Sequence, residues 1–368
     1  MRIEAIEIYR VAMPLVYPFR TAFSDESAIE SVLVCLRSGG LAGWGETSPW
    51  RAPFYSGEWA HGAFAVVRDW LGPQLVGREV ESGAALQQAL APVKANPFAK
   101  ASLDLAWWDL YAQMEGRPLW QVLGGQGPTA KVGADLGVME TLDRLLDEIA
   151  AAQAAGFERV KLKYRPGWEL NMVQRVRAAF PELVIHVDCN SAYTLADRPM
   201  FQALDAYGLA MIEQPLTHDD LLDHAVLQRD LRTPLCLDES ITSPAKARQA
   251  IDLKACGWVN LKLGRVGGIT NALIIHDLCQ AAGLPCWVGG MLESAVGQAH
   301  NLAFATKSNI RYPADIFPTS RFYAEDLGEP AITLSGPSQM TASARPGLGH
   351  RPRADQLRRL TVESASLR

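Results

Sequence analysis

Residues 181–193 read PELVIHVDCNSAY, and this stretch decides how the rest of the chain is interpreted. Apolar and β-branched residues lead directly into Asp188, and Asn190 follows just before a predicted helix start. The pattern predicts a buried strand with a carboxylate at its end. Burying an ionised carboxylate is costly unless it is paired, hydrogen-bonded or bound to a metal. Because the stretch contains no lysine, the partners of Asp188 must come from elsewhere in the chain.

The same pattern of apolar run, loop and amphipathic helix repeats on both sides of this stretch, about every 25 residues from Lys131 onward. This spacing fits strands and helices joined by short loops, the unit of a parallel α/β sheet or barrel. The pattern separates a doubly wound sheet from a closed barrel poorly, but seven successive units without a glycine-rich dinucleotide turn favour the barrel. The apolar runs end at Val138, Lys163, Asp188, Glu213, Asp238, Lys262 and Val288.

The regions that flank the repeat have a different character. From residue 1 to about residue 123, strand-like pieces joined by a turn at Gly39-Gly40 precede helical stretches, which is an α+β pattern. The tail from Phe317, rich in Pro, Ser and Gly, is expected to be irregular and to lie over another part of the molecule, with its last dozen residues loosely held. The predicted units are residues 1–125, 126–316 and 317–368.

The composition indicates a globular protein that acts on a small molecule. The 368 residues are 48% hydrophobic and 20% charged, and this length and hydrophobic content allow a large core. The net charge is -5. Charges are scattered without long basic runs, and this argues against a nucleic-acid partner. Residues 278–292, one of the two longest runs free of Asp, Glu, Lys and Arg, fall short of a membrane span of about 20 residues. A charged N-terminus without an export signal and six cysteines without Cys-x-x-Cys spacing predict reduced thiols and a cytoplasmic location.

Charged residues stand at the ends of five consecutive predicted strands. In a parallel barrel these ends share one mouth, so their side chains converge although they are far apart in the sequence. Three converging carboxylates would repel one another unless a hard divalent cation joined them, which predicts Mg²⁺, with Mn²⁺ as a substitute. The predicted metal ligands are Asp188, Glu213 and Asp238.

Lysines flank this predicted metal site from both sides, with Lys161 and Lys163 on the strand before the carboxylates and Lys262 on the strand after them. A second cation and a metal are expected to lower a lysine pKa and make a neutral amine available as a base. The predicted chemistry is removal of a weakly acidic proton beside a carboxylate, with the metal holding the resulting enediolate. Taken singly, each acid is better explained as a salt-bridge partner, and Lys161 as a solvated lysine at the rim. Their order on five consecutive strands, with a lysine before and after three acids, favours catalysis.

Further positions are candidates for substrate binding, each with a structural alternative. Arg265, within the turn at 264–268, is either a surface charge or a contact to a substrate anion. The glycines of 289–294 precede a helix start whose N–H groups suit a carboxylate, or they form a plain turn. Aromatic-rich loops at 19–24 and 48–56 would line a pocket if the N-terminal region caps the barrel, or else pack its own core. The candidates are Phe23, Trp50, Phe54, Tyr55, Asn190, Arg265, Gly290, Met291, Glu293 and Ser294.

Several motifs resemble the muconate lactonizing subgroup of the enolase superfamily: KLK (161–163), DCN (188–190), EQP (213–215), DES (238–240) and KLGRVGG (262–268). PFYS (53–56), NSAYTLAD (190–197), GGMLES (289–294) and SRFYAEDL (320–327) are most similar to its o-succinylbenzoate synthase and N-acylamino acid racemase branch. The likeness covers nearly the whole chain. It implies a modified TIM barrel of seven β/α units plus a final strand, capped by an α+β domain that the N-terminal part and the C-terminal tail form together.

The resemblance also implies an activity and roles for the strand-end residues. Lys163 would remove the proton α to the substrate carboxylate, and Lys262 would steady the enediolate or act on its opposite face. The implied reaction is dehydration of 2-succinyl-6-hydroxy-2,4-cyclohexadiene-1-carboxylate to 2-succinylbenzoate, a step of menaquinone biosynthesis. Racemisation of N-acylamino or N-succinylamino acids is the alternative, and one chain carries out both if they share the enediolate step. A small-molecule carboxylate substrate and a homo-oligomer are expected.

Other functions fit less well. Muconate cycloisomerase is the hardest of them to distinguish, because it shares the lysines and the metal ligands. A dipeptide epimerase would carry paired aspartates on the last strand, where Asp315 stands alone. A sugar-acid dehydratase would use a histidine at a late strand end, and none is present there; His186 is expected in the core or behind the site. A non-catalytic binding protein predicts the loss of a key charge, whereas all are present. Cys189 and Leu263 depart from the residues common in the subgroup, which bears on fine specificity only.

Overall fold

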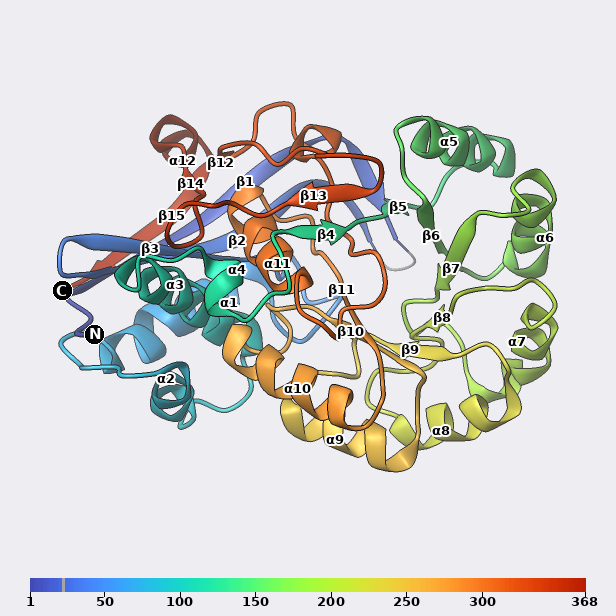
Figure 1. Cartoon of the computed structure of the whole chain (residues 1–368), viewed down its shortest axis with the longest axis horizontal. Coiled ribbons are helices and arrows are strands. Elements are labelled where there is room, and N and C mark those ends of the chain that lie inside the picture. The colour runs from blue at the N-terminus through green and yellow to red at the C-terminus, as the bar shows by residue number, and fades with distance from the viewer. Residues whose placement is uncertain (22–23) are drawn as a thin grey trace.

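The computed structural model describes residues 1–21 and 24–368 and contains two main sheets, a four-stranded sheet near both chain ends and a seven-stranded parallel sheet (Figure 1). The parallel sheet curls, and helices follow its outer side. This arrangement agrees with the predicted α/β barrel beside an α+β cap. None of the helices in the described part of the chain combines the length and the apolar character that crossing a membrane requires.

The barrel strands run in chain order around the sheet, and every ladder between them is parallel. After the last of them, the segment around residues 310–315 makes parallel bridges to Cys286 on one side and to Val132 on the other, so it closes the ring. The predicted seven β/α units plus a final strand are therefore confirmed. The strands are β5 (Ala134–Leu136), β6 (Arg159–Lys163), β7 (Val184–Asp188), β8 (Ile212–Glu213), β9 (Leu235–Leu237), β10 (Trp258–Leu261) and β11 (Cys286–Val288).

A helix follows each barrel strand. Several of these helices begin at a residue whose side-chain oxygen accepts a hydrogen bond from a backbone N–H of the first turn, for example Thr141, Asp220 and Ser243. Such caps fix where each strand-to-helix loop ends, and thereby the position of the strand end before it. The helices are α5 (Leu142–Ala154), α6 (Glu169–Ala179), α7 (Arg198–Leu204), α8 (Leu221–Asp230), α9 (Pro244–Leu253), α10 (Ile269–Ala281) and α11 (Ala295–Ala305). Helices such as α5, α6 and α9 bury one apolar stripe in the barrel core, whereas α11 is buried on all sides.

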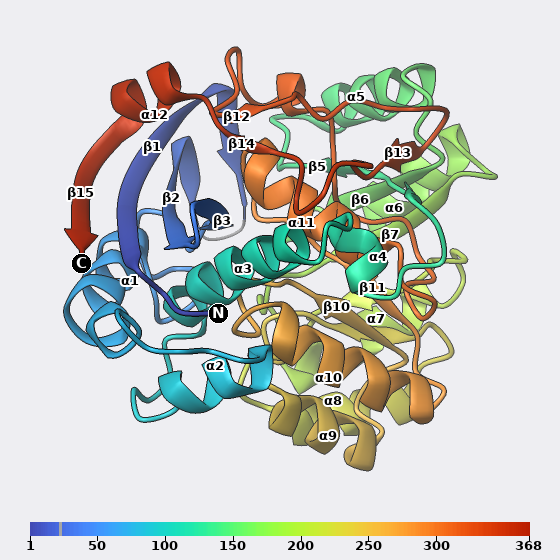
Figure 2. The ribbon, with the colours of Figure 1, turned by 60° about the vertical axis from the view of Figure 1, so that its left-hand side comes forward.

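The cap consists of β1 (Ala5–Arg20), β2 (Asp25–Ser38) and β3 (Leu41–Thr47), followed by α1 (Ala60–Val66), α2 (Gly83–Leu90), α3 (Pro97–Met114) and α4 (Leu119–Val122). The helix α3 crosses from the cap sheet toward the barrel, where it contacts α10 (Figure 2). Two glycines of β3 allow α3 to pack closely, because a Cβ on Gly43 or Gly45 would lie 2.3 or 2.2 Å from a carbonyl oxygen of α3.

The C-terminal tail adds the fourth strand of the cap sheet. The tail contains β12 (Gly328–Glu329), β13 (Gln339–Thr341), β14 (Arg351–Pro352), α12 (Ala354–Leu360) and β15 (Thr361–Leu367). β15 pairs antiparallel with β1, from Ile6 opposite Leu367 to Val11 opposite Thr361. The prediction that the last dozen residues are loosely held was therefore wrong. Backbone pairing orders this polar edge strand, and Leu367 packs against the cap core.

Candidate active site

The ladders of the barrel bring the predicted charges to one rim. Lys163 pairs with Asp188 across β6 and β7, and Asp188 pairs with Glu213 across β7 and β8. Asp238 directly follows β9, and Lys262 directly follows β10. Since parallel strands end on the same side of the sheet, these side chains face a common mouth.

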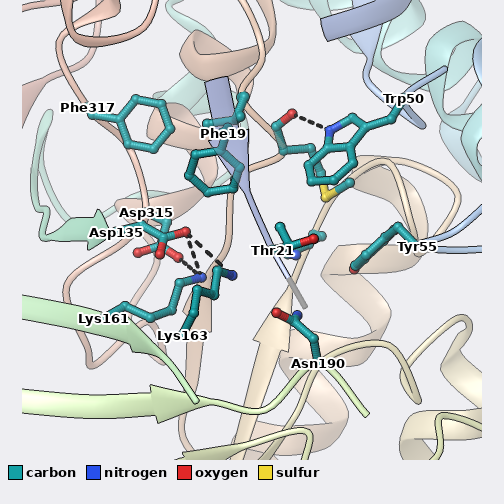
Figure 3. Close-up of a pocket in the computed structure, with 14 residues that line it drawn as sticks. Phe19, Thr21, Trp50, Tyr55, Asp135, Lys161, Lys163, Asn190, Asp315 and Phe317 are labelled. Carbon is teal, nitrogen blue, oxygen red and sulfur yellow. Dashed lines mark hydrogen bonds and ion pairs between the residues drawn. The ribbon is translucent and has the colours of Figure 1, made fainter. Parts of the chain in front are cut away.

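A small cavity of about 20 Å³ lies at this mouth (Figure 3). Lysines and aspartates lie on one side of it, and Trp50 and Tyr55 of the cap lie on the other. The cavity therefore has an ionic floor from the barrel and a largely apolar cover. Its polar lining residues are Asp135, Lys161, Lys163, Asn190, Lys262 and Asp315. Its other lining residues are Phe19, Thr21, Trp50, Tyr55, Gly290, Met291, Leu292 and Phe317.

The two lysines of β6 face a group of carboxylates. Lys163 Nζ lies 2.8 Å from Asp188 Oδ2 and 3.9 Å from Asp135 Oδ2. Lys161, whose side chain is 2% exposed, lies 3.2 Å from Asp135 and 2.5 Å from Asp315. Burial works to lower the pKa of Lys161, but these two carboxylates outweigh it and hold the pKa well above its ordinary value.

Lys262 faces a different environment, on the opposite side of the metal-ligand candidates. Its Nζ lies 3.0 Å from Asp238 Oδ2 and 4.6 Å from the centroid of the Tyr55 ring. Asp238 Oδ1 also accepts hydrogen bonds from the Tyr55 hydroxyl, at 3.2 Å, and from Arg265. Burial works to lower the pKa of Lys262, but neighbouring acidic groups, Tyr55 first, raise it above the ordinary value.

The pKa directions of Lys161 and Lys262 are thus opposite to the lowering that the sequence predicted. That prediction counted the second cation and the metal as the lysines' neighbours. The structure instead gives each lysine close carboxylates, and Asp135 and Asp315 were not foreseen among them.

Glu213 lies at the centre of the rim and is fully buried. Its Oε1 accepts a hydrogen bond of 2.6 Å from Asn260 Nδ2, and its Oε2 lies 3.3 Å from His186 Nε2. Burial works to raise the pKa of Glu213, but Lys161 and His186 outweigh it and hold the pKa well below its ordinary value. His186 therefore lies behind the site, as the sequence predicted, and contacts a candidate metal ligand.

The donor chemistry of the rim suits a hard divalent cation. In the described part of the chain, no three His, Cys, Asp or Glu side chains are arranged as a complete metal site, and lysines contact Asp188 and Asp238. Two buried oxygens, Glu213 Oε2 and Asp238 Oδ2, nevertheless have no hydrogen-bond partner beyond their contacts with His186 Nε2 and Lys262 Nζ. Carboxylate oxygens at adjacent strand ends are the ligands that Mg²⁺ and Mn²⁺ prefer, so the residues present fit such an ion.

The structure divides the candidate substrate-binding residues into groups. Trp50, Tyr55, Asn190, Gly290 and Met291 line the cavity, and Trp50 Nε1 donates to the Met291 carbonyl at 3.1 Å. Phe54 does not line it, since the residue is 63% exposed. Phe23 lies outside the described residues.

Three other candidates are buried outside the cavity lining and contact protein groups. Arg265 is 1% exposed and donates to the carbonyl oxygens of Ile241 and Asn260 as well as to Asp238. Glu293 Oε2 accepts a hydrogen bond from the Met291 N–H at 2.8 Å. The helix start at Ser294 does bind a carboxylate, but it is that of Glu46, which accepts the Ser294 N–H at 3.0 Å.

Sequence reasoning missed several residues of the site. Asp135 stands within the three-residue strand β5, and Asp315 stands in the segment that closes the barrel. Asp315 also pairs with the buried Arg159 at 2.7 Å. Their acidic character between apolar neighbours was an available signal. Phe19 belongs to the aromatic-rich stretch 19–24, from which Phe23 was named instead. Leu292 and Phe317 carried no signal of their own, because apolar residues usually pack the core.

Comparison with known proteins agrees with this geometry. The family model described as "Enolase C-terminal domain-like" matches residues 144–356. The model described as "Mandelate racemase / muconate lactonizing enzyme, N-terminal domain" matches residues 3–124. The chain belongs to the enolase superfamily. Enzymes of this superfamily are metal-dependent, in agreement with the oxygen donors at the rim.

Relatives place the chain in one branch of the enolase superfamily. It is 42% identical to the o-succinylbenzoate synthase of Geobacillus kaustophilus over 98% of this chain and 96% of that protein. It is 44% identical to the N-succinylamino acid racemase of Thermus thermophilus over 90% of each chain. A solved structure of an enolase superfamily member from Listeria innocua superposes with a TM-score of 0.96 at 34% identity, covering 100% of this chain and 99% of that one. The predicted synthase and racemase branch is confirmed.

Proposed function

We propose that this chain dehydrates 2-succinyl-6-hydroxy-2,4-cyclohexadiene-1-carboxylate to 2-succinylbenzoate, a step of menaquinone biosynthesis. The observation that carries the proposal is the pair of lysines, Lys163 and Lys262, which line the same cavity. In the sheet, β7, β8 and β9 lie between the strands that carry them. A reaction that begins with removal of a proton beside a carboxylate needs an amine on one face and positive charge on the other. Relatives that carry the synthase name support the assignment.

The proposed metal ligands are Asp188, Glu213 and Asp238, and the proposed ion is Mg²⁺, with Mn²⁺ as a substitute. When bound, a divalent cation supplies positive charge that stabilises an enediolate. Lys163 would then exchange its contact with Asp188 for one with substrate, and Lys262 would do so with its contact to Asp238. A cytoplasmic location and a homo-oligomeric state belong to the same proposal.

Lys163 performs both proton steps of the proposed dehydration. Its neutral amine takes the proton from the carbon beside the carboxylate, and the electron pair of that C–H bond passes into the enediolate. The resulting ammonium then gives the proton to the hydroxyl on the neighbouring ring carbon, whose C–O bond breaks as water leaves. The ring becomes aromatic and Lys163 is neutral again. Lys262 remains protonated and steadies the negative charge, while Trp50 and Tyr55 exclude water.

Racemisation of N-succinylamino acids is the second candidate, because the two lysines lie on opposite sides of the site. Lys163 would remove the α proton from one face, and Lys262 would deliver a proton to the other. The racemase name of close relatives supports this activity. Both reactions share the first step, so one chain can carry out both.

The test is to supply the purified protein and Mg²⁺ with each substrate. We expect formation of 2-succinylbenzoate, and we expect N-succinylamino acids in D₂O to gain deuterium at the α carbon as optical activity is lost. The two kcat/KM values show which reaction dominates. No turnover of the cyclohexadiene substrate with metal supplied would refute the synthase assignment.

A further inference from the structure

The inner cavity is too small for the whole of either proposed substrate. Its volume of about 20 Å³ is room for roughly one water molecule. Both substrates carry a second carboxylate at the end of a succinyl arm. If the carboxylate beside the reacting carbon lies at the lysines, the arm must extend beyond this cavity.

A larger outer cleft adjoins the inner cavity, with a volume of about 450 Å³. It shares two wall residues with the inner cavity, Phe19 and Asp135. The outer cleft runs between Tyr17–Arg20 of the cap, Asp135–Glu140 at the end of β5 and beyond it, and Arg321-Phe322 of the tail. The outer cleft therefore lies next to the catalytic cavity, on the side of Lys161 and Lys163.

Three arginines line the outer cleft, and two of them already have acidic partners. Arg20 pairs with Asp25 at 3.0 Å and with Glu140 at 3.3 Å. Arg144 pairs with Glu148 at 2.5 Å. Arg321 differs from both, since no carboxylate of residues 1–21 and 24–368 lies within 4.0 Å of its guanidinium nitrogens.

The guanidinium of Arg321 is held in place by uncharged groups. Its Nη2 donates to the backbone carbonyl of Asp135 at 3.2 Å, and its central carbon lies 5.9 Å from the Phe157 ring centroid and 5.6 Å from that of Phe322. Phe322 in turn packs on Phe317 and Phe19, with ring centroids 4.6 and 5.8 Å apart. Arg321 is thus fixed beside the cavity wall without its charge being neutralised.

We propose that Arg321 binds the distal carboxylate of the succinyl arm in the outer cleft. An arginine matches a carboxylate with two parallel hydrogen bonds, which makes it more selective than a single cation. The inference rests on the proposed function, because it takes its ligand from substrates that carry a succinyl group. It assigns a role to the first charged residue of the 320–327 motif, which the proton chemistry leaves unused.

The test compares two ligands that differ only in this group: the N-succinyl derivative of one amino acid and its N-succinamoyl counterpart, whose distal group is an uncharged amide. The wild type is expected to prefer the N-succinyl ligand by about tenfold or more in kcat/KM and in Kd. Arg321→Gln is expected to raise KM for this ligand about tenfold or more with little change in kcat, and to leave the values for the amide unchanged. Arg321→Lys should restore part of the preference, and Arg175→Gln, on a surface pair with Asp143, should keep all of it.

The two ligands also separate a binding role from a structural one. If Arg321 only supports the cavity wall, Arg321→Gln weakens both ligands equally and the preference persists, which overturns the proposal. Calorimetric titration in the presence of Mg²⁺ measures the preference without turnover. A wild type that binds with this preference but does not racemise the N-succinyl ligand would refute the racemase activity alone, whereas a wild type without the preference would refute this inference.

Discussion

The two sides of the catalytic mouth differ in how carboxylates and cations are grouped. On the side of β6, four carboxylates lie within 4.0 Å of Lys161. On the side of β10, Lys262 and Arg265 both contact one carboxylate, Asp238. A proton can therefore pass between Lys163 and a substrate in a region rich in acceptors, while the opposite side is suited to holding negative charge. Two lysines in matching positions are thus expected to contribute differently to catalysis.

Removal of Lys163 should have the largest effect. Lys163→Ala deletes the proposed base for both reactions, so kcat should fall by about 10²- to 10⁴-fold or below detection. Steady-state kinetics of dehydration and racemisation measure this, with circular dichroism to check folding. Activity within tenfold of the wild type would show that another group is the base.

Asp188→Ala tests whether the carboxylate-rich side supplies a metal ligand. Loss of a proposed ligand should abolish metal-dependent turnover while the barrel stays folded, because β7 keeps its backbone ladders to both neighbours. Titration of activity and of Mg²⁺ binding measures the effect. A variant with full activity and unchanged Mg²⁺ affinity would contradict the ligand assignment.

Lys262→Ala should separate the two reactions. Racemisation requires a proton donor on the second face and should fall by about 10²- to 10⁴-fold. Dehydration needs only stabilisation from that face and should fall by about tenfold, the value of one charged contact. In D₂O this variant should exchange the α proton of one enantiomer without inverting it, as NMR can detect. Equal losses in both reactions would mean that the lysines are equivalent after all.

Tyr55→Phe probes the support of Lys262. The phenol donates to Asp238 Oδ1 at 3.2 Å and accepts from Arg265 at 3.0 Å. The variant loses both hydrogen bonds, each worth about 1 kcal/mol, while Asp238 and Arg265 still contact each other, so kcat/KM or Mg²⁺ affinity should fall by about five- to thirtyfold. Mg²⁺-dependent kinetics measure it. A loss of racemisation as large as that of Lys262→Ala would assign Tyr55 a direct part in the reaction.

The smallest effect on activity is expected at Glu46, which joins the cap to the barrel helix α11. Burial raises the pKa of Glu46 to about 7, from an ordinary value of 4.5, although Ser294 and Gly297 donate hydrogen bonds to it. The unfolded chain releases this proton at lower pH than the folded one. Glu46 therefore contributes stability below about pH 4.5 that is lost as pH rises to about 7.

Glu46→Gln removes this titration. Denaturant unfolding of both proteins between pH 4.5 and 8 should show a free-energy difference that changes with pH, with the wild type losing more stability on the way to pH 7. Parallel stability curves would exclude this pH dependence. Activity of the variant at a fixed pH should stay close to that of the wild type.

The charges at the strand ends were predictable because two regularities of parallel sheets determine where they lie. Strand polarity brings the ends of β6, β7 and β8 to one rim, and the alternation of side chains puts Lys161 and Lys163 on the same face. Residues such as Asp188 and Glu213 could thus be related to each other before any coordinates were known.

The remaining parts of the site obey no such regularity. Asp315 reaches the rim from an irregular closing segment, and Trp50 reaches it from a loop of the cap, so no sequence period specifies their direction. Arg265 is a residue type that often contacts anionic ligands, but here it is buried and contacts other residues of the protein. β15 escaped prediction because an edge strand is stabilised mainly by backbone pairing, which its polar side chains do not reveal.

The pairing of β15 with β1 has a consequence for how the chain is made. β1 leaves the ribosome before any barrel strand, and its partner leaves after all of them, since Ile6 lies opposite Leu367. During synthesis the outer edge of β1 therefore has unpaired backbone groups, the kind of edge that invites aggregation. The cap sheet reaches four strands only after the complete barrel has been synthesised, so cap assembly is expected to be the late, slow step of folding.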